Sequence, residues 1–222
     1  MSGSVISPAV RARIRGAAVP VALAFGRMGL TPNALTVIGF GIAIVAAFAA
    51  SRQGWVAAGL LVIVGGVFDL FDGALARATN QVSRLGAFLD SVFDRAGESV
   101  LYIGVATGFL IAGHERVVLL SATAMASSFM VSYTRAKSES LGFTPGTGMA
   151  SVGLAPREVR LVILSLGLLA GAALDAEPVL SITLGLITAL ATITTIQRIV
   201  HVTRQTPPVS ASAASPGGDQ HP

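Results

Sequence analysis

The sequence has 222 residues, of which 53% are hydrophobic and 12% are charged, and its mean hydropathy is +0.75. An average soluble domain carries about 25% charged residues, so this composition excludes an ordinary soluble domain and indicates an integral membrane protein. The formal net charge of +4 is spread over the ends of apolar stretches, which argues against a nucleic-acid partner. Cysteine is absent, which excludes disulfides and thiolate metal sites.

The first 30 residues combine arginines with apolar residues and are interrupted by Pro20. They contain no long apolar core followed by a small-residue cleavage site, as a signal peptide would. We therefore expect an amphipathic juxtamembrane helix over residues 1–30, lying in the membrane interface. Thr31 and Pro32 follow, and they provide a cap and a first-turn proline for the next helix.

Six apolar stretches follow in the chain, and each is long enough to cross a hydrocarbon core about 30 Å thick. Their approximate limits are Asn33–Ala50, Trp55–Ala78, Leu85–Ala112, Arg116–Lys137, Arg157–Leu174 and Pro178–Val200. The sequence thus predicts an all-α integral membrane protein with six transmembrane helices. Residues 1–204 form one domain, with the six-helix bundle over 31–204, and residues 205–222, rich in Pro, Ser, Ala and Gly, form a disordered tail.

Lys and Arg residues indicate the orientation of this bundle, because cytoplasmic loops carry an excess of them. Short breaks at 51–54, 113–115 and 175–177 join the helices in three consecutive pairs, so all three breaks are expected on the same side of the membrane. The only basic residues on that side are Arg52 and Arg116. The opposite side holds Arg11, Arg13, Arg15, Arg27, Arg77, Arg84, Arg135, Lys137, Arg157, Arg160, Arg198 and Arg204. We expect a multi-pass plasma-membrane protein with both termini in the cytoplasm.

Four carboxylates lie within the apolar sequence, at Asp69, Asp72, Asp90 and Asp94. On helices the first two stand three residues apart and the last two four apart, so each pair projects from one helical face. The predicted topology puts both pairs near the cytoplasmic ends of two antiparallel neighbours. Ionised groups at membrane depth are costly unless they are paired or metal-bound, so we expect one shared functional site there.

These carboxylates favour a metal site over a purely structural one. Hard oxygen ligands without nearby His or Cys select Mg²⁺, Mn²⁺ or Ca²⁺, and two carboxylate pairs suit a two-metal site for phosphoryl displacement. The alternative is a set of ion pairs with Arg77, Arg84 and Arg95, but four carboxylates outnumber these bases. Small residues beside the aspartates allow close approach of a substrate or close packing of helices.

The same region contains a spaced pattern, DxxDGxxAR, eight residues, then GxxxDxxxD. It is complete at Asp69, Asp72, Gly73, Ala76, Arg77, Gly86, Asp90 and Asp94. The pattern resembles the signature of the CDP-alcohol phosphotransferases, membrane enzymes of phospholipid synthesis with six transmembrane helices and an N-terminal juxtamembrane helix. The resemblance covers nearly the whole chain except the tail, and it also implies a homodimer.

The resemblance implies transfer of a phosphatidyl group from CDP-diacylglycerol to an alcohol, with release of CMP. It implies that Asp69, Asp72, Asp90 and Asp94 hold two divalent ions, Mg²⁺ or Mn²⁺, and that Asp94 also serves as general base. The residues it implies for the CDP-lipid are Asn33, Gly73, Ala76, Arg77 and Gly86.

Basic residues at the inner ends of the last three helices bear on which acceptor the protein uses. Arg135, Lys137, Arg157 and Arg198 are expected at one cytoplasmic mouth, where they can bind a phosphate on the acceptor or merely follow the positive-inside bias. The stretches Ser132–Gly142 and Pro156–Arg160 are similar to those of prokaryotic phosphatidylinositol phosphate synthases, in which matching bases form a pocket for inositol phosphate. We therefore expect a phosphorylated polyol, inositol phosphate, as the acceptor.

Three other functions remain as alternatives. A phosphatidylglycerophosphate synthase would use the same chemistry with glycerol 3-phosphate. An intramembrane prenyltransferase also uses Asp-rich helices and Mg²⁺, but its motifs stand on widely separated helices. A divalent-cation transporter would place carboxylates near the bilayer midplane. Glu98 lies one turn beyond Asp94 on the same helical face, and the sequence leaves open whether it supports the site or pairs with a base deeper in the bundle.

Overall fold

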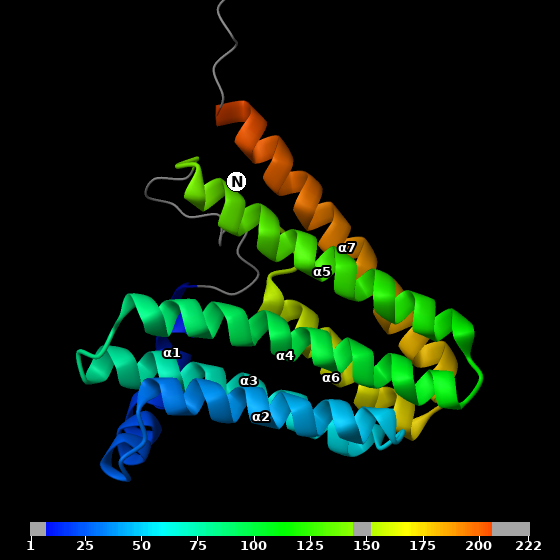
Figure 1. Cartoon of the computed structure of the whole chain (residues 1–222), viewed down its shortest axis with the longest axis horizontal. Helices are drawn as coiled ribbons and strands as arrows, with labels where there is room; N and C mark the ends of the chain where they lie inside the picture. Colours follow the sequence, from blue (N-terminus) through cyan, green and yellow to red (C-terminus); the bar gives the residue numbers. More distant parts are fainter. Residues whose placement is uncertain (1–7, 144–151, 206–222) are drawn as a thin grey trace, which may run out of the picture.

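The computed structural model describes residues 8–143 and 152–205, which fold into seven α-helices (Figure 1). The helices are α1 (Pro8–Arg27), α2 (Pro32–Ser51), α3 (Trp55–Ala78), α4 (Arg84–Ile111), α5 (Glu115–Ser140), α6 (Arg157–Ala173) and α7 (Ala176–Gln205). The expected all-α fold is confirmed. Of the predicted tail only Gln205 lies within the described residues, where it is the last residue of α7, and residues 206–222 lie outside them.

The helix starts follow from local capping. The Thr31 side chain accepts a hydrogen bond from the Ala34 amide at 3.2 Å, and Pro32 occupies the first turn of α2. Ser83 caps α4 in the same way, accepting from the Gly86 amide at 3.0 Å. Such caps are local sequence signals, so the predicted stretches and the observed helices agree closely.

Four of these helices, α2, α3, α5 and α7, are long and apolar enough to cross a membrane. The chain is therefore a multi-pass membrane protein, although the expected six spans are not all recognisable by length and composition. The helix α4 differs because Asp90, Asp94, Arg95 and Glu98 interrupt its apolar sequence, and α6 is short, with 17 residues.

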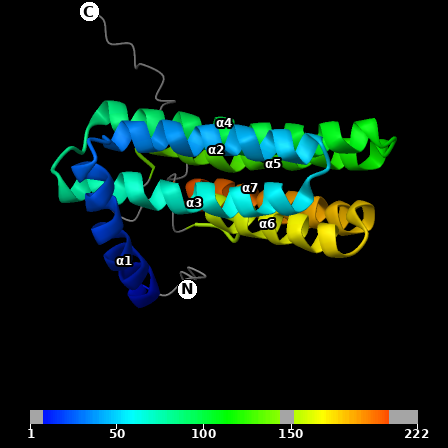
Figure 2. The same cartoon turned by 90° about the horizontal axis from the view of Figure 1, so that it is seen from below.

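The helices form a bundle with two layers, α2, α4 and α5 in one and α3, α6 and α7 in the other (Figure 2). The turns that join α2 to α3, α4 to α5 and α6 to α7 all lie at one end, as expected (Figure 1). We call the opposite end the site end. It contains the α3–α4 connection, so the second half of α3 and the first half of α4 lie toward it, whereas the short α6 begins farther along the bundle (Figure 1).

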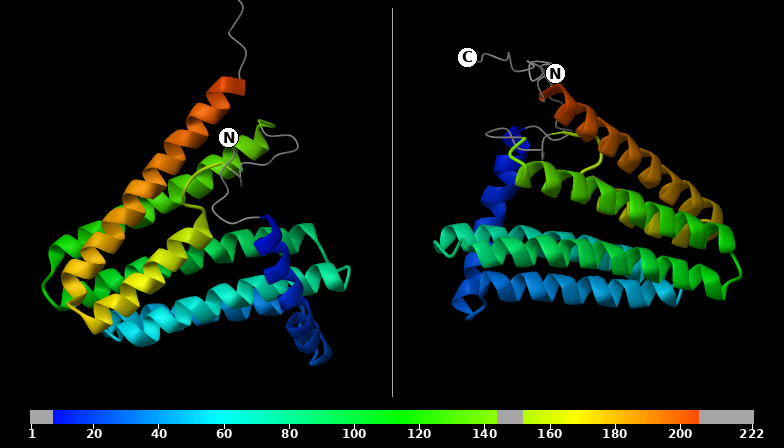
Figure 3. Two further views of the ribbon diagram at one scale, coloured as in Figure 1. Left: turned by 180° about the vertical axis from the view of Figure 1, so that it is seen from behind. Right: turned by 45° about the horizontal axis from the view of Figure 1, so that its top comes forward.

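The first helix crosses the bundle at a steep angle at the site end (Figure 3). It packs on α3 through the buried Ala18 and Ala22, while the Phe25 ring lies 5.8 Å from that of Phe68 and 5.6 Å from that of Phe71. These two α3 phenylalanines flank Asp69 in sequence. The helix α1 therefore supports the part of α3 that carries the first carboxylate pair.

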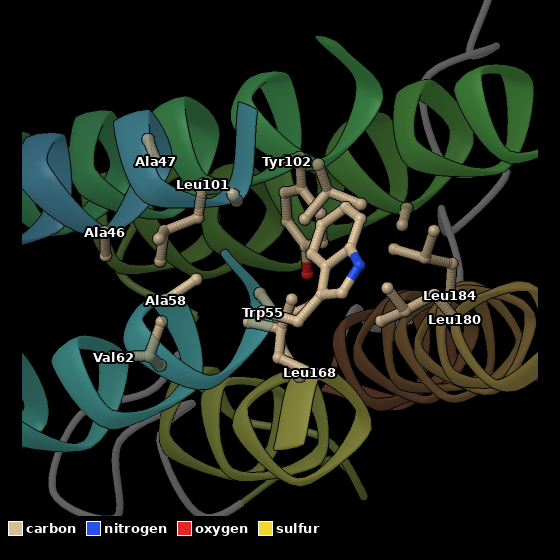
Figure 4. Close-up of a cluster of buried hydrophobic side chains, with 14 of the residues drawn as sticks. Ala46, Ala47, Trp55, Ala58, Val62, Leu101, Tyr102, Leu168, Leu180 and Leu184 are labelled. Carbon is tan, nitrogen blue, oxygen red and sulfur yellow. The ribbon is translucent and has the colours of Figure 1, made fainter. Parts of the chain in front are cut away.

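The far end of the bundle holds the main apolar core. Trp55 lies among Tyr102, Leu168, Leu180 and Leu184 (Figure 4) and stacks on Phe109 at 5.0 Å. Glycines bring α2 and α4 close together here, because an added Cβ at Gly104 would lie 2.3 Å from the Ala47 carbonyl oxygen. The GxxxG spacing of Gly104 and Gly108 thus serves helix packing.

This close approach predicts that substitutions of two different glycines change the stability of the protein to different extents. Gly104→Ala forces α2 and α4 apart, and we expect it to lower the free energy of unfolding by about 1–3 kcal/mol, the usual cost of overpacking. Gly41→Ala is the control, because a Cβ at Gly41 meets nothing within 4 Å. Thermal unfolding of the two variants in detergent measures the difference, and equal midpoints would contradict the α2–α4 contact.

Candidate active site

The four aspartates lie at the site end on two consecutive helices. Asp69 and Asp72 stand in the last three turns of α3, and Asp90 and Asp94 stand in the first three turns of α4. The short α3–α4 connection makes these helices antiparallel, so the chain returns at once to the same depth. The structure therefore places the predicted carboxylates at one end of the bundle, as the topology indicated, but α3 and α4 are not the close neighbours that were expected, because both pack mainly on α2.

A basic residue from a distant part of the chain joins them. Arg157, the first residue of α6, puts Nη1 2.6 Å from Asp69 Oδ2 and 2.7 Å from Asp94 Oδ1. The side chains of all three are 20–26% exposed. One guanidinium nitrogen thus bridges carboxylates from α3 and α4, and the sequence contained no local signal for this contact.

The arginines considered as structural partners contribute less. Arg95 approaches Asp94 only at 4.0 Å, and its Nη1 donates to the Ser91 carbonyl oxygen at 2.7 Å. Arg77 folds back over its own helix, with Nη1 3.2 Å from the position a Cβ on Gly73 would take. The main counter-charge at the aspartates therefore comes from α6, and not from the bases beside them in sequence.

Asp72 has a different environment. Its side chain is buried, with 6% of the residue exposed, and the Thr36 hydroxyl of α2 donates to its Oδ2 at 2.8 Å. The sequence did not predict a role for Thr36, although Thr36 lies one turn after Pro32 at the start of α2. A charge-assisted hydrogen bond of this kind orients the carboxylate. The helix α2 therefore fixes one member of the set.

A small cavity of about 30 Å³ opens beside the Arg157 bridge, between α2, α3, α4 and α6. Asp69, Asp94 and Arg157 form part of its polar lining, and Gly39 and Gly97 are among the small residues around it. Gly39 leaves room beside the bridge, because a Cβ there would lie in tight contact with Asp69 Oδ1, at 3.2 Å. Polar groups and space for about one water molecule therefore coincide beside the carboxylates.

The residues expected to hold the CDP-lipid also lie at the site end. Asn33 at the start of α2 approaches α4, with its Oδ1 3.1 Å from the position of a Cβ on Gly86. Gly73, Ala76 and Arg77 follow Asp72 in the last turns of α3. Asn33 and Gly86 thus lie near the aspartates of α4, and Gly73, Ala76 and Arg77 lie beside those of α3.

The four predicted acceptor bases lie in different surroundings. Arg157 bridges the carboxylates, Arg135 forms an exposed ion pair with Glu139 at 2.9 Å, and Lys137 is exposed. Arg198 is buried, and it donates to the carbonyl oxygens of Val131 and Val152, the latter at 3.0 Å. All four stand at the site end of their helices, but they do not form one continuous ring.

The donor set suits a hard cation. Within residues 8–143 and 152–205 no three carboxylate, His or Cys side chains already converge on one point. A positively charged guanidinium nitrogen nevertheless stands between Asp69 and Asp94, so the two helices hold their oxygens around a cation. Oxygen-only donors of this kind are those that Mg²⁺ and Mn²⁺ prefer.

Comparison with known proteins agrees with this site. Residues 29–201 match the family of CDP-alcohol phosphatidyltransferases. An archaetidylinositol phosphate synthase of Pyrococcus horikoshii is 34% identical over 190 residues, which cover 86% of this chain and 93% of that protein. A phosphatidylinositol phosphate synthase of Streptomyces avermitilis is 33% identical over 208 residues, covering 90% of this chain and 84% of its own.

Solved structures of similar fold come from Mycobacterium tuberculosis phosphatidylinositol phosphate synthase. The form with CDP-DAG bound has a TM-score of 0.72 and 27% identity, and the match covers 91% of this chain and 98% of that one. The complex with manganese and citrate has a TM-score of 0.73 and 27% identity, covering 90% and 93%. The bundle described above is therefore shared over nearly its whole length.

The Arg157 bridge predicts a stability effect. Arg157→Gln removes the counter-charge from Asp69 and Asp94, and we expect a loss of about 1–2 kcal/mol, less than for a fully buried pair because these groups are partly exposed. Thermal unfolding in detergent with a chelator measures it. The control is Arg135→Gln, which breaks an exposed pair and should leave the midpoint unchanged. A wild-type midpoint for Arg157→Gln would contradict the bridge.

Proposed function

This chain belongs to the CDP-alcohol phosphatidyltransferase family and is thus a transferase, and we propose that it transfers a phosphatidyl group from CDP-diacylglycerol to inositol phosphate, releasing CMP. The observation that carries the proposal is the complete eight-residue signature, which lies on α3 and α4 at one end of the bundle. The two relatives are named for different lipid products, archaetidylinositol phosphate and phosphatidylinositol phosphate, but both names contain inositol phosphate, which supports it as the acceptor.

In this proposal Asp69, Asp72, Asp90 and Asp94 hold two divalent ions, Mg²⁺ or Mn²⁺. Manganese in one structural neighbour supports a divalent metal, and the oxygen donors of this chain support the same choice. When bound, such ions supply neutralisation of the pyrophosphate charge. Thr36 contributes by holding the Asp72 carboxylate in place.

The transfer itself needs a base and a leaving group. Asp94 takes the proton of the acceptor hydroxyl, whose oxygen forms a new bond to the lipid-linked phosphorus. The bond from that phosphorus to the bridging oxygen breaks, and CMP leaves with this oxygen. Asn33, Gly73, Ala76, Arg77 and Gly86 hold the CDP part, with the small residues admitting the nucleotide and Arg77 offering planar donors to phosphate.

Arg157 has a second role in this proposal, as a ligand for the acceptor phosphate. Its guanidinium can exchange carboxylate oxygens for phosphate oxygens, because both accept the same paired donors. Its Nε is buried and has no hydrogen-bond partner among the described residues, so a donor is still available. Arg135, Lys137 and Arg198 complete the acceptor site from α5 and α7.

The proposal includes an orientation in the membrane. All six helices α2–α7 cross the plasma membrane, α1 lies in the interface, and the site end and both termini face the cytoplasm, where the basic residues gather. Residues 1–204 act as one domain, and two copies form a homodimer. The charged α4 spans the membrane because Asp94 and Glu98 are paired with arginines of α6 within the bundle.

Purified protein tests the proposed reaction directly. CMP release is followed with CDP-diacylglycerol and Mg²⁺ or Mn²⁺, and inositol phosphate, glycerol 3-phosphate, serine and free inositol are offered in turn. We expect release with inositol phosphate and at least tenfold less with the others. Release with glycerol 3-phosphate alone would replace the acceptor but keep the chemistry, and no release with any acceptor would overturn the proposal.

A substitution tests the role of Asp94. Asp94→Asn keeps the shape of the side chain but cannot accept the hydroxyl proton, so we expect turnover to fall by about 10²-fold or more, the usual worth of a general base. Metal-dependent binding of CDP-diacylglycerol, measured by calorimetry, should persist. Asp175→Asn in the α6–α7 turn is the control and should keep wild-type turnover. Unimpaired turnover of Asp94→Asn would remove Asp94 as base.

A further inference from the structure

A second ion pair joins α4 to α6, deeper in the bundle than the Arg157 bridge. Arg160 Nε lies 2.7 Å from Glu98 Oε1, and Arg160 Nη2 lies 2.6 Å from Glu98 Oε2, so the contact is bidentate. The two side chains are 0% and 5% exposed. Neither residue belongs to the signature, and the proposed reaction uses neither.

The pair is held on both sides. The Tyr102 hydroxyl donates to Glu98 Oε1 at 3.3 Å and lies 3.2 Å from the Ser128 hydroxyl of α5. On the other side Arg160 Nη1 donates to the Ala155 carbonyl oxygen at 2.8 Å, just before α6 begins. Both charged groups are therefore hydrogen-bonded beyond their mutual contact, which fixes their orientation.

Stability alone does not account for this pair. Taking two charges out of water costs several kcal/mol each, and well-packed apolar residues at such positions are often equally stable or more so. Ionisable residues inside a membrane bundle are instead usually tied to function. The location of Glu98 and Arg160 in the two helices points to the function concerned.

The two ion pairs between α4 and α6 are one helical turn apart. On α4, Glu98 follows Asp94 by four residues, and on α6, Arg160 follows Arg157 by three, so each helix presents both members on one face. The inner pair is bidentate and buried. The outer pair has one guanidinium nitrogen shared between two carboxylates beside the cavity.

The segment before α6 is also fixed to α7. The Thr194 hydroxyl accepts from the amides of Leu154 and Ala155 at 3.1 and 3.0 Å. Gly153, with φ +118°, allows this contact, because a Cβ there would lie 2.2 Å from the Thr194 methyl carbon. The start of α6 is thus anchored through its preceding segment to α7 and through Arg160 to α4.

From this arrangement we propose that Glu98 is a positioning residue, which acts through Arg160 to hold the start of α6 so that Arg157 reaches the aspartates and the acceptor phosphate. The buried pair sets the position of α6 along α4. Arg157 can then exchange its carboxylate partners for a phosphate while α6 stays in place. For its kinetic consequences this inference rests on the proposed function.

Two variants separate positioning from mere stabilisation. Glu98→Gln keeps the side-chain shape but removes the charge. The double variant Glu98→Met with Arg160→Met removes both charges and keeps apolar volume, so it should fold even if the single variant does not. The control is Glu177→Gln at the far end of the bundle, where the Glu177 carboxylate accepts from Ser181 at 3.3 Å.

Steady-state kinetics give the first readout. In both Glu98 variants we expect the KM for inositol phosphate to rise about tenfold or more, while the KM for CDP-diacylglycerol changes less than twofold. Glu177→Gln should match the wild type in both. If the double variant is stable and has wild-type KM values, Glu98 has no positioning role and the proposal is wrong.

Spin labels give a second readout that does not depend on activity. The chain lacks cysteine, so labelled cysteines at the exposed Val92 of α4 and Val162 of α6 report one distance. We expect a narrow distance distribution in the wild type and in Glu177→Gln, and a broader or shifted one in the double variant. An unchanged distribution would overturn the inference. If the wild type releases no CMP, the proposed function fails. The spin-label distances still decide whether the Glu98–Arg160 pair positions α6.

Discussion

The aspartates of α3 and α4 impose the constraint on which the rest of the bundle depends. Charge in an apolar bundle needs a counter-charge nearby, and the guanidinium of Arg157 supplies it to Asp69 and Asp94 at 2.6 and 2.7 Å. This contact requires α6 to begin beside Asp69 of α3 and Asp94 of α4. The anchoring of the preceding segment on Thr194 and the small Gly39 on α2 both follow from that requirement.

Much of the fold was predictable because its signals are local. Apolar stretches and caps such as Thr31 predicted the helices, and helical spacing with the count of basic residues predicted that the aspartates lie at one end. The contacts of Arg157 with Asp69 and of Thr36 with Asp72 were not predicted. For Glu98 the sequence left open a pairing with a deeper base, which the structure confirms, but it did not identify Arg160 as that base. Each contact joins residues more than 30 positions apart, and no periodicity in a single chain encodes which polar residues meet across such a distance.

The helices that are hardest to recognise as membrane spans are those that contain the polar contacts. The apolar character of α4 is interrupted by Asp90, Asp94, Arg95 and Glu98, and short α6 begins with Arg157 and contains Arg160. A hydropathy average counts every charge as if it faced lipid, whereas in the structure Asp94 and Glu98 of α4 face Arg157 and Arg160 of α6. A departure from the hydropathy pattern at α4 and α6 is thus where a functional site is expected.

In the proposed reaction, the α4–α6 contacts let Arg157 change partners without loosening the bundle. An ion pair that must open to admit a ligand cannot also fix the positions of the helices. Its opening would free α6 at the moment when the ligand binds. A dry, bidentate pair one turn deeper solves this problem, since water and ligands do not reach it. Glu98 and Arg160 can therefore stay paired while Arg157 exchanges its partners, and α6 keeps its place beside the carboxylates.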